Sequence, residues 1–299
     1  MKRKTFLKHS SLTAFSIMAF GSIKWNGNRF TGDSPTTTDI LGPFYRPGAP
    51  MRNNIVPSDS KGQALKLSGT VFKADGKSTL ANTLVEIWQC DENEAYDNTS
   101  DDYRFRGAVR TGPDGKYRFS TIIPVPYEAA PKLWRPAHIH FRVSHPDHQD
   151  LITQIYFKGD PHLEKDLGSA SPSAQNRILE TGKGKDGVQQ VSFNIVMRKE
   201  FDLDDQAYKK ITGIYEMKDG MAEFYREDDL LMMKINGQIR EALTYKGENT
   251  FEGGLGLVKT KFTLTQKGAS VEISTGAFDE GDLSKVTVNK GEKILKYGG

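Results

Sequence analysis

The sequence predicts a mainly β protein, in which an antiparallel β-sandwich domain is followed by a smaller C-terminal β domain. Short alternating apolar segments recur along the chain, separated by the turn-favouring dipeptides Asp-Gly, Asn-Gly and Gly-Gly. Apolar residues at helical spacing are scarce. At 299 residues the chain is long enough for two cores of ordinary size.

The sandwich domain is expected over residues 39–200. Leu65, Leu67 and Val71 alternate with other residues and so define one face of a strand. Six strands are predicted in this domain, at residues 65–72, 83–89, 117–122, 137–143, 151–157 and 191–197. The long connection at 160–187 is a candidate for a loop that covers a site.

A second β domain is expected over residues 205–299, after a charged stretch breaks the first strand pattern. The turn dipeptides Asp219-Gly220, Asn236-Gly237 and Gly253-Gly254 separate its apolar runs. Its strands are predicted around Tyr215 and at residues 230–235, 243–245, 261–265, 271–273 and 286–288. This part has no histidine and no cluster with metal-ligand spacing, so packing, docking or glycan contact is expected here rather than catalysis.

The N-terminus predicts export to the periplasm or the cell exterior. Four lysines and arginines in the first eight residues precede an apolar stretch at 12–23 that is too short to span a bilayer. Residues 3–8, RKTFLK, resemble a degenerate twin-arginine signal, which suits a protein exported after loading its metal. The alternative is an uncleaved membrane tether at 1–24. Residues 25–38 are polar and are expected to form a linker.

Charge and cysteine content exclude several classes of function. The 41 Lys+Arg and 38 Asp+Glu residues are interspersed, so nothing indicates a nucleic-acid partner. The single cysteine, Cys90, excludes an intrachain disulfide and a cysteine-rich metal cluster. Because no nearby motif would lower its pKa, Cys90 is expected to be a partly buried apolar residue rather than a catalytic thiol.

The segment WRPAHIHFRV at residues 134–143 carries the central chemical signal. Side chains alternate along an extended strand, so His138, His140 and Arg142 are expected to share the face opposite the core. A strand fixes two such imidazoles about 7 Å apart, which suits two ligands of one metal. The His-x-His pattern alone is weak evidence, because it also occurs in zinc, copper and cupin sites.

The remaining histidines add no simple zinc motif, whereas two tyrosines occupy informative positions. His145, His148 and His162 lie in polar, loop-like sequence. Tyr96 follows the end of a predicted strand, and Tyr127 ends the segment IPVPY shortly before the histidine strand. A phenol titrates near 10, so a bound phenolate requires a strongly acidic metal such as Fe(III). Composition alone does not distinguish these two among the eleven tyrosines.

Six short motifs occur in order over about half of the chain. They are ILGPFYRP at 40–47, VEIWQ at 85–89, DGKYRF at 114–119, PVPY at 124–127, WRPAHIHF at 134–141 and TQIYFKGD at 153–160. Together they make residues 40–196 resemble the intradiol ring-cleaving dioxygenases, the family of protocatechuate and catechol dioxygenases. The resemblance implies a mononuclear non-haem Fe(III) enzyme that uses O2 to open a catechol-type ring into a cis,cis-muconate-type diacid.

Position by position, the resemblance implies four iron ligands: Tyr96, Tyr127, His138 and His140. Two phenolates and a hydroxide would balance the charge of Fe(III) while leaving it a Lewis acid. The resemblance further implies that Tyr127 leaves the metal when the diol chelates it. The protein would contribute geometry, charge balance and exclusion of water.

The resemblance also implies a substrate pocket beside the metal. Arg135 matches an arginine that stabilises the ketonised, carbanion-like substrate, and Gln154 matches a glutamine that lines the same pocket. Elsewhere an arginine such as Arg135 would be expected in a surface ion pair. Tyr103 and Arg104 are further pocket candidates, and Trp134 is equally explained as a core aromatic residue.

Other features leave the substrate and alternative functions open. Residues 128–133 lack the tryptophan found after this tyrosine in many protocatechuate enzymes and the longer insertion of catechol-specific ones, so the ring substituent is not predicted. One alternative is an exported transthyretin-like module that binds a ligand or glycan without catalysis. Another is a zinc or copper enzyme that uses only His138 and His140. Assembly into a homo-oligomer also stays open.

Overall fold

The computed structural model describes most of the chain beyond its N-terminus. The described ranges are 23–25, 30–32, 36–199, 205–227, 230–264, 268–279 and 282–295. Strands predominate within them, which confirms the mainly β prediction. No helix in these ranges is both long and apolar enough to cross a membrane. The export signal or tether predicted for residues 1–24 lies outside the described residues, apart from its last two positions.

The segment expected to form a linker includes part of a short β-sheet. β1 (Ile23–Trp25) and β2 (Phe30–Gly32) pair in antiparallel register. The linker prediction for residues 25–38 therefore needs correction at these strands. The Asn26-Gly27 dipeptide lies between them in the sequence and is a hairpin signal.

Contacts between Cα positions divide the chain into two compact units. The first consists of Met1–Thr37, Gly48–Val143 and Gln154–Arg198, and the second of Thr38–Pro47, Ser144–Thr153 and Lys199–Gly299. Two short segments from earlier in the chain thus group with the C-terminal part. A boundary placed near residue 200 from sequence alone leaves both of them in the first domain.

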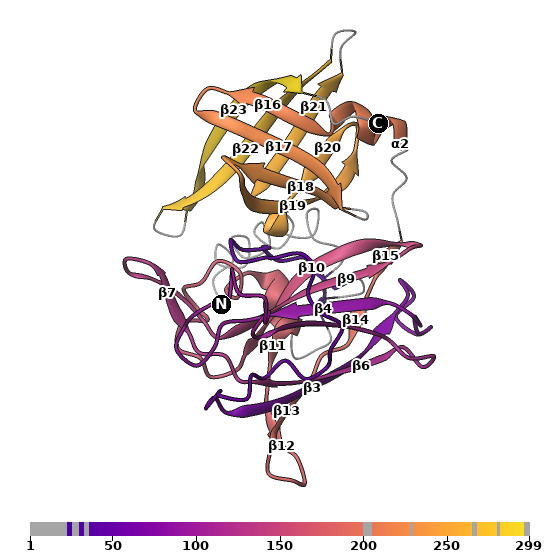
Figure 1. Cartoon of the computed structure of the whole chain (residues 1–299), viewed down its shortest axis with the longest axis vertical. Coiled ribbons are helices and arrows are strands. Elements are labelled where there is room, and N and C mark those ends of the chain that lie inside the picture. Colours follow the sequence, from indigo (N-terminus) through magenta and orange to yellow (C-terminus); the bar gives the residue numbers. More distant parts are fainter. Residues whose placement is uncertain are drawn as a thin grey trace, which may run out of the picture. The chain divides into compact units, whose positions relative to one another are not determined.

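One sheet carries the histidine strand in its interior. Its strands follow the order β11-β10-β9-β4-β5, and β15 also pairs with β10 (Figure 1). The bounds are β4 (Leu84–Trp88), β5 (Arg106–Arg110), β9 (His138–His145), β10 (His148–Phe157), β11 (Ile178–Leu179) and β15 (Arg198–Lys199). β4, β9 and β10 correspond to predicted strands. β5 and β11 do not, because β5 has arginine at both ends and a glycine beside one of them, and β11 has only two residues.

A second sheet is built around β3. The bounds of its strands are β3 (Ala64–Phe72), β6 (Lys116–Ile122), β12 (Gly182–Lys183), β13 (Gln189–Ser192) and β14 (Ile195–Val196). β6 pairs with β3 in antiparallel register, whereas β13 and β14 both pair with it in parallel. Leu65, Leu67 and Val71 are buried and Lys66 and Ser68 are exposed, so the predicted alternation of this strand is confirmed.

The single strand predicted at residues 191–197 is split into β13 and β14. Asn194 Oδ1 accepts a hydrogen bond from the Thr70 backbone N–H at 3.0 Å, so a side chain replaces one rung of the ladder. The carbonyl of Phe193 approaches β3 so closely that a Cβ on Gly69 would lie 1.8 Å from its oxygen. Only glycine fits at position 69 without a shift of the backbone.

A hairpin that the sequence analysis did not predict precedes the histidine strand. β7 (Tyr127–Ala130) pairs with β8 (Leu133–Arg135), and a register shift follows Glu128. Lys132 has a φ of +66° in the turn, and its N–H donates to Glu128 Oε1 at 2.7 Å. In this register Tyr127 is paired with Arg135, which brings two of the predicted site residues together.

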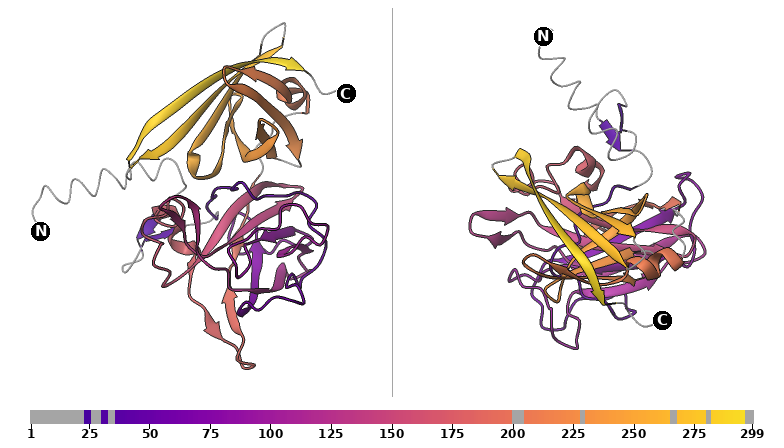
Figure 2. Two further views of the ribbon diagram at one scale, coloured as in Figure 1. Left: turned by 60° about the vertical axis from the view of Figure 1, so that its left-hand side comes forward. Right: turned by 90° about the horizontal axis from the view of Figure 1, so that it is seen from above.

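The second unit contains a closed antiparallel barrel (Figure 2). Its strands are β16 (Gly213–Met217), β17 (Gly220–Glu227), β18 (Leu230–Ile235), β19 (Gln238–Gly247), β20 (Thr250–Glu252), β21 (Val258–Leu264), β22 (Ala269–Asp279) and β23 (Asp282–Leu295). Each pairs with the next along the chain, and β16 pairs with β23 to close the ring. The predicted turn Asn236-Gly237 joins β18 to β19, and both residues have positive φ.

Aromatic side chains fill the interior of the barrel. Tyr215, Phe224, Phe251 and Phe262 are buried and make edge-on or tilted ring contacts with centroids 5.0–5.8 Å apart. The helix α2 (Asp205–Ile211) adds two buried residues to the same core. A short 3-10 turn, η2 (Gly254–Gly256), follows β20. The barrel is thus held by its own apolar core.

Candidate active site

The strand β9 brings its two histidine rings together in an edge-to-face arrangement, with centroids 4.7 Å apart. His138 and His140 are each 1% exposed, and their Nε2 atoms lie 3.1 Å apart. His138 Nδ1 lies 2.6 Å from the Pro136 carbonyl oxygen, which can only accept, so that nitrogen carries the proton. The lone pair of His138 Nε2 therefore points toward His140. The two ring nitrogens converge more closely than the spacing of residues along a strand implies.

Both faces of β9 are buried, not only the apolar one. Ile139, Phe141 and Val143 on one face are fully buried, and the histidines with Arg142 on the other are almost so. The indole of Trp88, at the end of β4, stacks on the His140 ring with centroids 4.8 Å apart and planes 8° from parallel. Burial lowers the pKa of both imidazoles well below the usual range, so both are neutral near pH 7.

Two tyrosines complete this cluster. Tyr96 Oη lies 3.3 Å from His138 Nε2, and its ring meets the Tyr127 ring edge-on with centroids 5.7 Å apart. The Tyr127 ring centroid is 5.6 Å from that of His138. Burial raises the pKa of both phenols above its usual value. We refer to Tyr96, Tyr127, His138 and His140 as the O2N2 cluster.

The O2N2 cluster has the donors that a trivalent metal prefers. It supplies two neutral imidazoles and two phenols whose ionised form is disfavoured by burial. A cation between them would stabilise the phenolates and bind the imidazole nitrogens. These residues therefore fit Fe(III). Among the described residues, His, Cys, Asp and Glu form no group of three or more that could hold a metal.

The loop that carries Tyr96 is fixed by Asp97. Its carboxylate accepts hydrogen bonds from the Ser100 N–H and hydroxyl and from the Arg104 N–H at 2.6–2.9 Å. Burial raises the pKa of Asp97, but these hydrogen bonds outweigh it and lower the pKa to about 2. Arg106 Nε donates to the Asp97 carbonyl at 2.7 Å, which ties the loop to β5. The hydrogen bonds of Asp97 thus hold the backbone next to Tyr96 in place.

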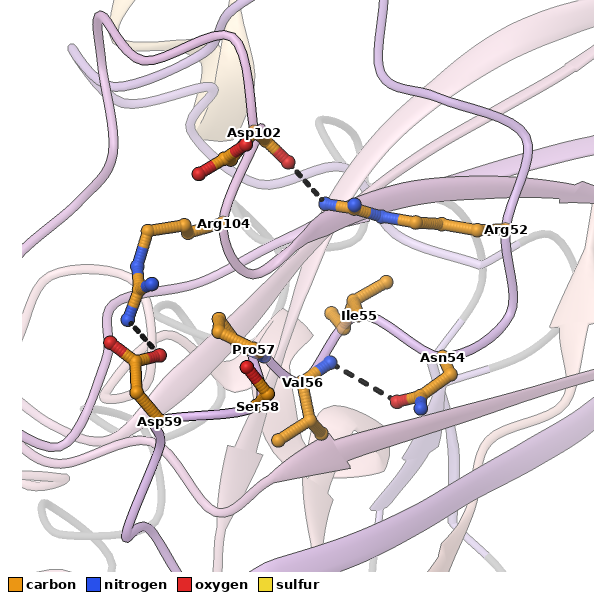
Figure 3. Close-up of a pocket in the computed structure, with 9 residues that line it drawn as sticks. All are labelled: Arg52, Asn54, Ile55, Val56, Pro57, Ser58, Asp59, Asp102 and Arg104. Atoms are coloured by element: carbon orange, nitrogen blue, oxygen red, sulfur yellow. Dashed lines mark hydrogen bonds and ion pairs between the residues drawn. The ribbon is translucent and has the colours of Figure 1, made fainter.

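Tyr103 and Arg104, the two further candidates, lie later in the same connection between β4 and β5. Arg104 forms an ion pair with Asp59 at 2.9 Å and lines a polar pocket of about 480 Å³ (Figure 3). Arg52 also lines that pocket and donates to the backbone carbonyls of Asp102 and Tyr103. The O2N2 cluster is not part of the pocket lining. The structure therefore gives Arg104 a structural partner rather than a place beside the cluster.

Arg135 is held in a buried network. Its Nη2 donates to Gln154 Oε1 at 2.8 Å, so the structure brings together the two residues predicted to line the substrate pocket. Its Nε lies 2.6 Å from Asp166 Oδ1, and both side chains are at most 10% exposed. Tyr156 Oη donates to the same Gln154 oxygen at 3.1 Å. Arg135 thus forms a buried ion pair, not the surface one typical of arginine.

Asp166 was not among the site residues predicted from the sequence. It lies in the 160–187 connection, which also contains the 3-10 turn η1 (Pro172–Arg177) and two short strands. The only signal was the expectation that this connection covers a site. No local pattern distinguishes Asp166 from the other acidic residues of the loop, because its partner Arg135 is distant in the sequence.

Trp134, His145 and His148 differ from their expected environments, whereas His162 lies in a turn as expected. Trp134 is 38% exposed and stacks on His162 with ring centroids 5.0 Å apart, so it is not a core residue. His145 and His148 belong to β9 and β10 rather than to a loop, and their rings contact each other. Cys90 is 1% exposed, and burial raises the pKa of its thiol to about 12, as expected for a residue without a catalytic role.

Comparisons with known proteins find dioxygenases among the proteins similar to this chain. A family model described as Dioxygenase matches residues 40–199. Catechol 1,2-dioxygenase 2 of Acinetobacter lwoffii is 38% identical over 159 residues, covering 47% of this chain and 57% of that protein. Chlorocatechol 1,2-dioxygenase of Rhodococcus opacus is 34% identical over 162 residues, covering 46% and 62%. This chain thus spans about three fifths of the length of these relatives.

Solved structures of similar proteins point the same way. The structure of catechol 1,2-dioxygenase from Acinetobacter sp. ADP1 superposes with a TM-score of 0.52 at 28% identity, covering 58% of this chain and 66% of that one. The structure of 3-chlorocatechol 1,2-dioxygenase from Rhodococcus opacus superposes with a TM-score of 0.50 at 28% identity, covering 56% and 74%. The comparisons do not favour the transthyretin-like binding module.

Proposed function

Because the chain belongs to the intradiol ring-cleaving dioxygenase family, we propose that it uses O2 and mononuclear non-haem Fe(III) to open a catechol-type ring between its two hydroxylated carbons. The observation that carries this proposal is the buried O2N2 cluster, in which two phenols and two neutral imidazoles converge. The product would be a cis,cis-muconate-type diacid.

Tyr96, Tyr127, His138 and His140 would hold the iron. When bound, the ion would supply Lewis acidity, which stabilises the phenolates and draws electron density from a chelated catecholate. The Pro136 carbonyl fixes the tautomer of His138 so that Nε2 keeps its lone pair for the metal. Trp88 fixes the plane of the His140 ring by stacking on it.

Arg135 and Gln154 would bind and orient the substrate. The guanidinium is buried, and the Arg135 backbone pairs with that of Tyr127 in the β7–β8 hairpin. Burial raises the pKa of the Tyr127 phenol and the positive charge of Arg135 opposes this larger effect, so a diol that meets this phenol would also meet the charge. A fixed charge in a buried site stabilises a developing negative charge better than it would in water. Tyr127 Oη would accept one proton from the incoming diol. The burial of β9 and β10 would exclude water from the site.

The substrate class follows from the names of the relatives. They include catechol, chlorocatechol, hydroxyquinol and 6-chlorohydroxyquinol 1,2-dioxygenases, which share a 1,2-diphenol as substrate. We assign this chain a 1,2-diphenol without choosing its ring substituent. Residues 1–24 support action outside the cytoplasm, reached by a twin-arginine-like route.

Visible spectroscopy of the iron-loaded full-length chain tests the proposal. Charge transfer from tyrosinate to Fe(III) should colour the protein, and anaerobic addition of a 1,2-diphenol should shift the band. Tyr96→Phe should weaken the band and abolish O2 uptake, whereas Tyr225→Phe, a matched change on β17 of the barrel, should alter neither. An iron-loaded protein that is colourless and opens no diphenol would refute the proposal.

A further inference from the structure

We propose that Asp166 is a positioning residue, which orients the Arg135 guanidinium toward the substrate; this inference rests on the function proposed above. Asp166 Oδ1 and Arg135 Nε are 2.6 Å apart, and the two side chains are 3% and 10% exposed. A charged pair so deeply buried is costly unless its geometry is good and its remaining lone pairs are satisfied. The carboxylate has a second partner in its own loop, and the guanidinium has a second partner in Gln154.

The position of the Asp166 carboxylate is set by its own loop rather than by Arg135. Its Oδ2 accepts a hydrogen bond from the Ser169 N–H at 2.9 Å. Its backbone N–H donates to the His162 carbonyl at 3.2 Å, and its carbonyl accepts from the Ala170 N–H at 2.9 Å. The carboxylate is therefore a fixed point to which a flexible arginine can be anchored.

The Arg135 guanidinium contacts two partners, Asp166 and Gln154, through nitrogens on the same edge. Nε meets Asp166 while Nη2 donates to Gln154 Oε1, and these two nitrogens form the same side of the planar fork. Gln154 is fixed in turn, because its side-chain oxygen accepts from Tyr156 Oη and its backbone carbonyl accepts from Arg177 Nη1 at 2.8 Å. The ion pair and the hydrogen bond together restrict the position of the Arg135 guanidinium.

The same loop is also anchored to the start of the ligand strand. Asp160 Oδ2 accepts a hydrogen bond from the Ala137 N–H at 2.8 Å, one residue before His138. The loop is thus attached on both sides of Pro136, at Arg135 through Asp166 and at Ala137 through Asp160. Asp166 therefore links the covering loop to the residue that would meet the substrate.

The test compares Asp166→Asn with Glu164→Gln, a control that removes an exposed carboxylate from the same loop. Asp166→Asn should lower kcat for a 1,2-diphenol by about 10- to 100-fold, as is usual when a residue supporting an active-site group is changed. The tyrosinate band of the resting iron protein should stay unchanged, and KM should change less than kcat. Asp166→Glu should recover part of the loss, and Glu164→Gln should match the wild type.

Arg135→Lys combined with Asp166→Asn decides whether Asp166 acts through Arg135. If it does, the double variant should lose little more kcat than Arg135→Lys alone. Independent losses that multiply would overturn the inference, and so would an unchanged kcat in Asp166→Asn. Should that variant fail to fold, Asp166→Ser replaces it in the same cycle with the same criteria.

Crystal structures of the wild type and of Asp166→Asn give a readout that does not depend on activity. The Arg135 guanidinium should leave Gln154 in the variant while the O2N2 cluster stays in place. If Arg135 keeps its position, the inference is wrong whatever the kinetics. If the wild type opens no diphenol but Arg135 still moves in the variant, the proposed function fails and the positioning role of Asp166 stands.

Discussion

Tyr127 and Arg135 are paired across the β7–β8 hairpin. One belongs to the O2N2 cluster and the other to the buried network with Gln154 and Asp166. A change in the hairpin would thus move a phenol and a guanidinium together. The hairpin fixes the register of the two residues, and Asp166 and Gln154 restrict where the guanidinium lies.

Arg135→Met should cost both activity and stability. Loss of the positive charge is expected to lower kcat/KM by about 10²- to 10³-fold. It also leaves Asp166 buried and unpaired, which should lower the free energy of unfolding by about 3–5 kcal/mol. Urea unfolding measures the second effect and steady-state O2 uptake the first.

A second change separates the two effects. Adding Asp166→Leu to Arg135→Met removes the unpaired charge, so most of the stability should return while kcat/KM stays low. If stability does not return, the loss in Arg135→Met comes from altered packing rather than from the buried carboxylate.

Gly69→Ala should destabilise the first unit. The new Cβ would lie 1.8 Å from the Phe193 carbonyl oxygen, so β3 or the link between β13 and β14 would have to shift, at a cost of about 1–3 kcal/mol or more. Gly182→Ala is the control, because nothing lies within 4 Å of a Cβ there. Equal unfolding midpoints for the two variants would contradict the close approach seen at Gly69.

Glu241→Gln should stabilise the barrel at neutral and higher pH. Burial raises the pKa of Glu241 to about 7, although the Ala242 N–H, at 3.2 Å, opposes this shift. Because the folded pKa exceeds the unfolded one, the contribution of Glu241 is fully present below about pH 4.5 and is lost as pH rises to 7. The loss amounts to roughly 3 kcal/mol.

Denaturation measured from pH 4 to pH 8 tests this sign. The free energy of unfolding of the wild type, relative to that of Glu241→Gln, should fall between about pH 4.5 and pH 7 and stay level above pH 7. Glu216→Gln, an exposed change on β16, should follow the wild type. A wild type that gains stability relative to Glu241→Gln as pH rises would contradict the raised pKa.

Cys90 should not react with thiol reagents in the folded protein. Its pKa of about 12 leaves almost no thiolate near pH 8, and the side chain is 1% exposed. A disulfide exchange reagent should label the chain only after unfolding in urea. Rapid stoichiometric labelling under native conditions would show that the thiol is accessible.

Much of the fold and of the site follows from short-range patterns. The strand predicted at 230–235 coincides with β18, and β3 extends one residue beyond its predicted start, because alternation and turn dipeptides act locally. The His-x-His pair was also visible locally. Tyr96 and Tyr127 became candidates only through resemblance, since nothing near them in the sequence records that their rings meet.

Long-range contacts account for what could not be predicted. Asp166 contacts Arg135 through a loop without a regular pattern, and Asn194 breaks a strand by binding Thr70 on another. Both faces of β9 are buried because Trp88 and its neighbours cover the polar one. Each of these features depends on a partner that only the folded chain brings near.

Closure of the barrel has a consequence for how the chain folds. β16 can complete its backbone hydrogen bonds only when it pairs with β23, the last strand of the barrel. The six other strands lie between these two in the sequence. Until then the first and last strands of the growing sheet expose unpaired backbone edges, which are templates for aggregation. Closure by such a distant partner also tends to be slow. Shortening β23 should therefore trap an open, self-associating sheet rather than yield a smaller stable domain.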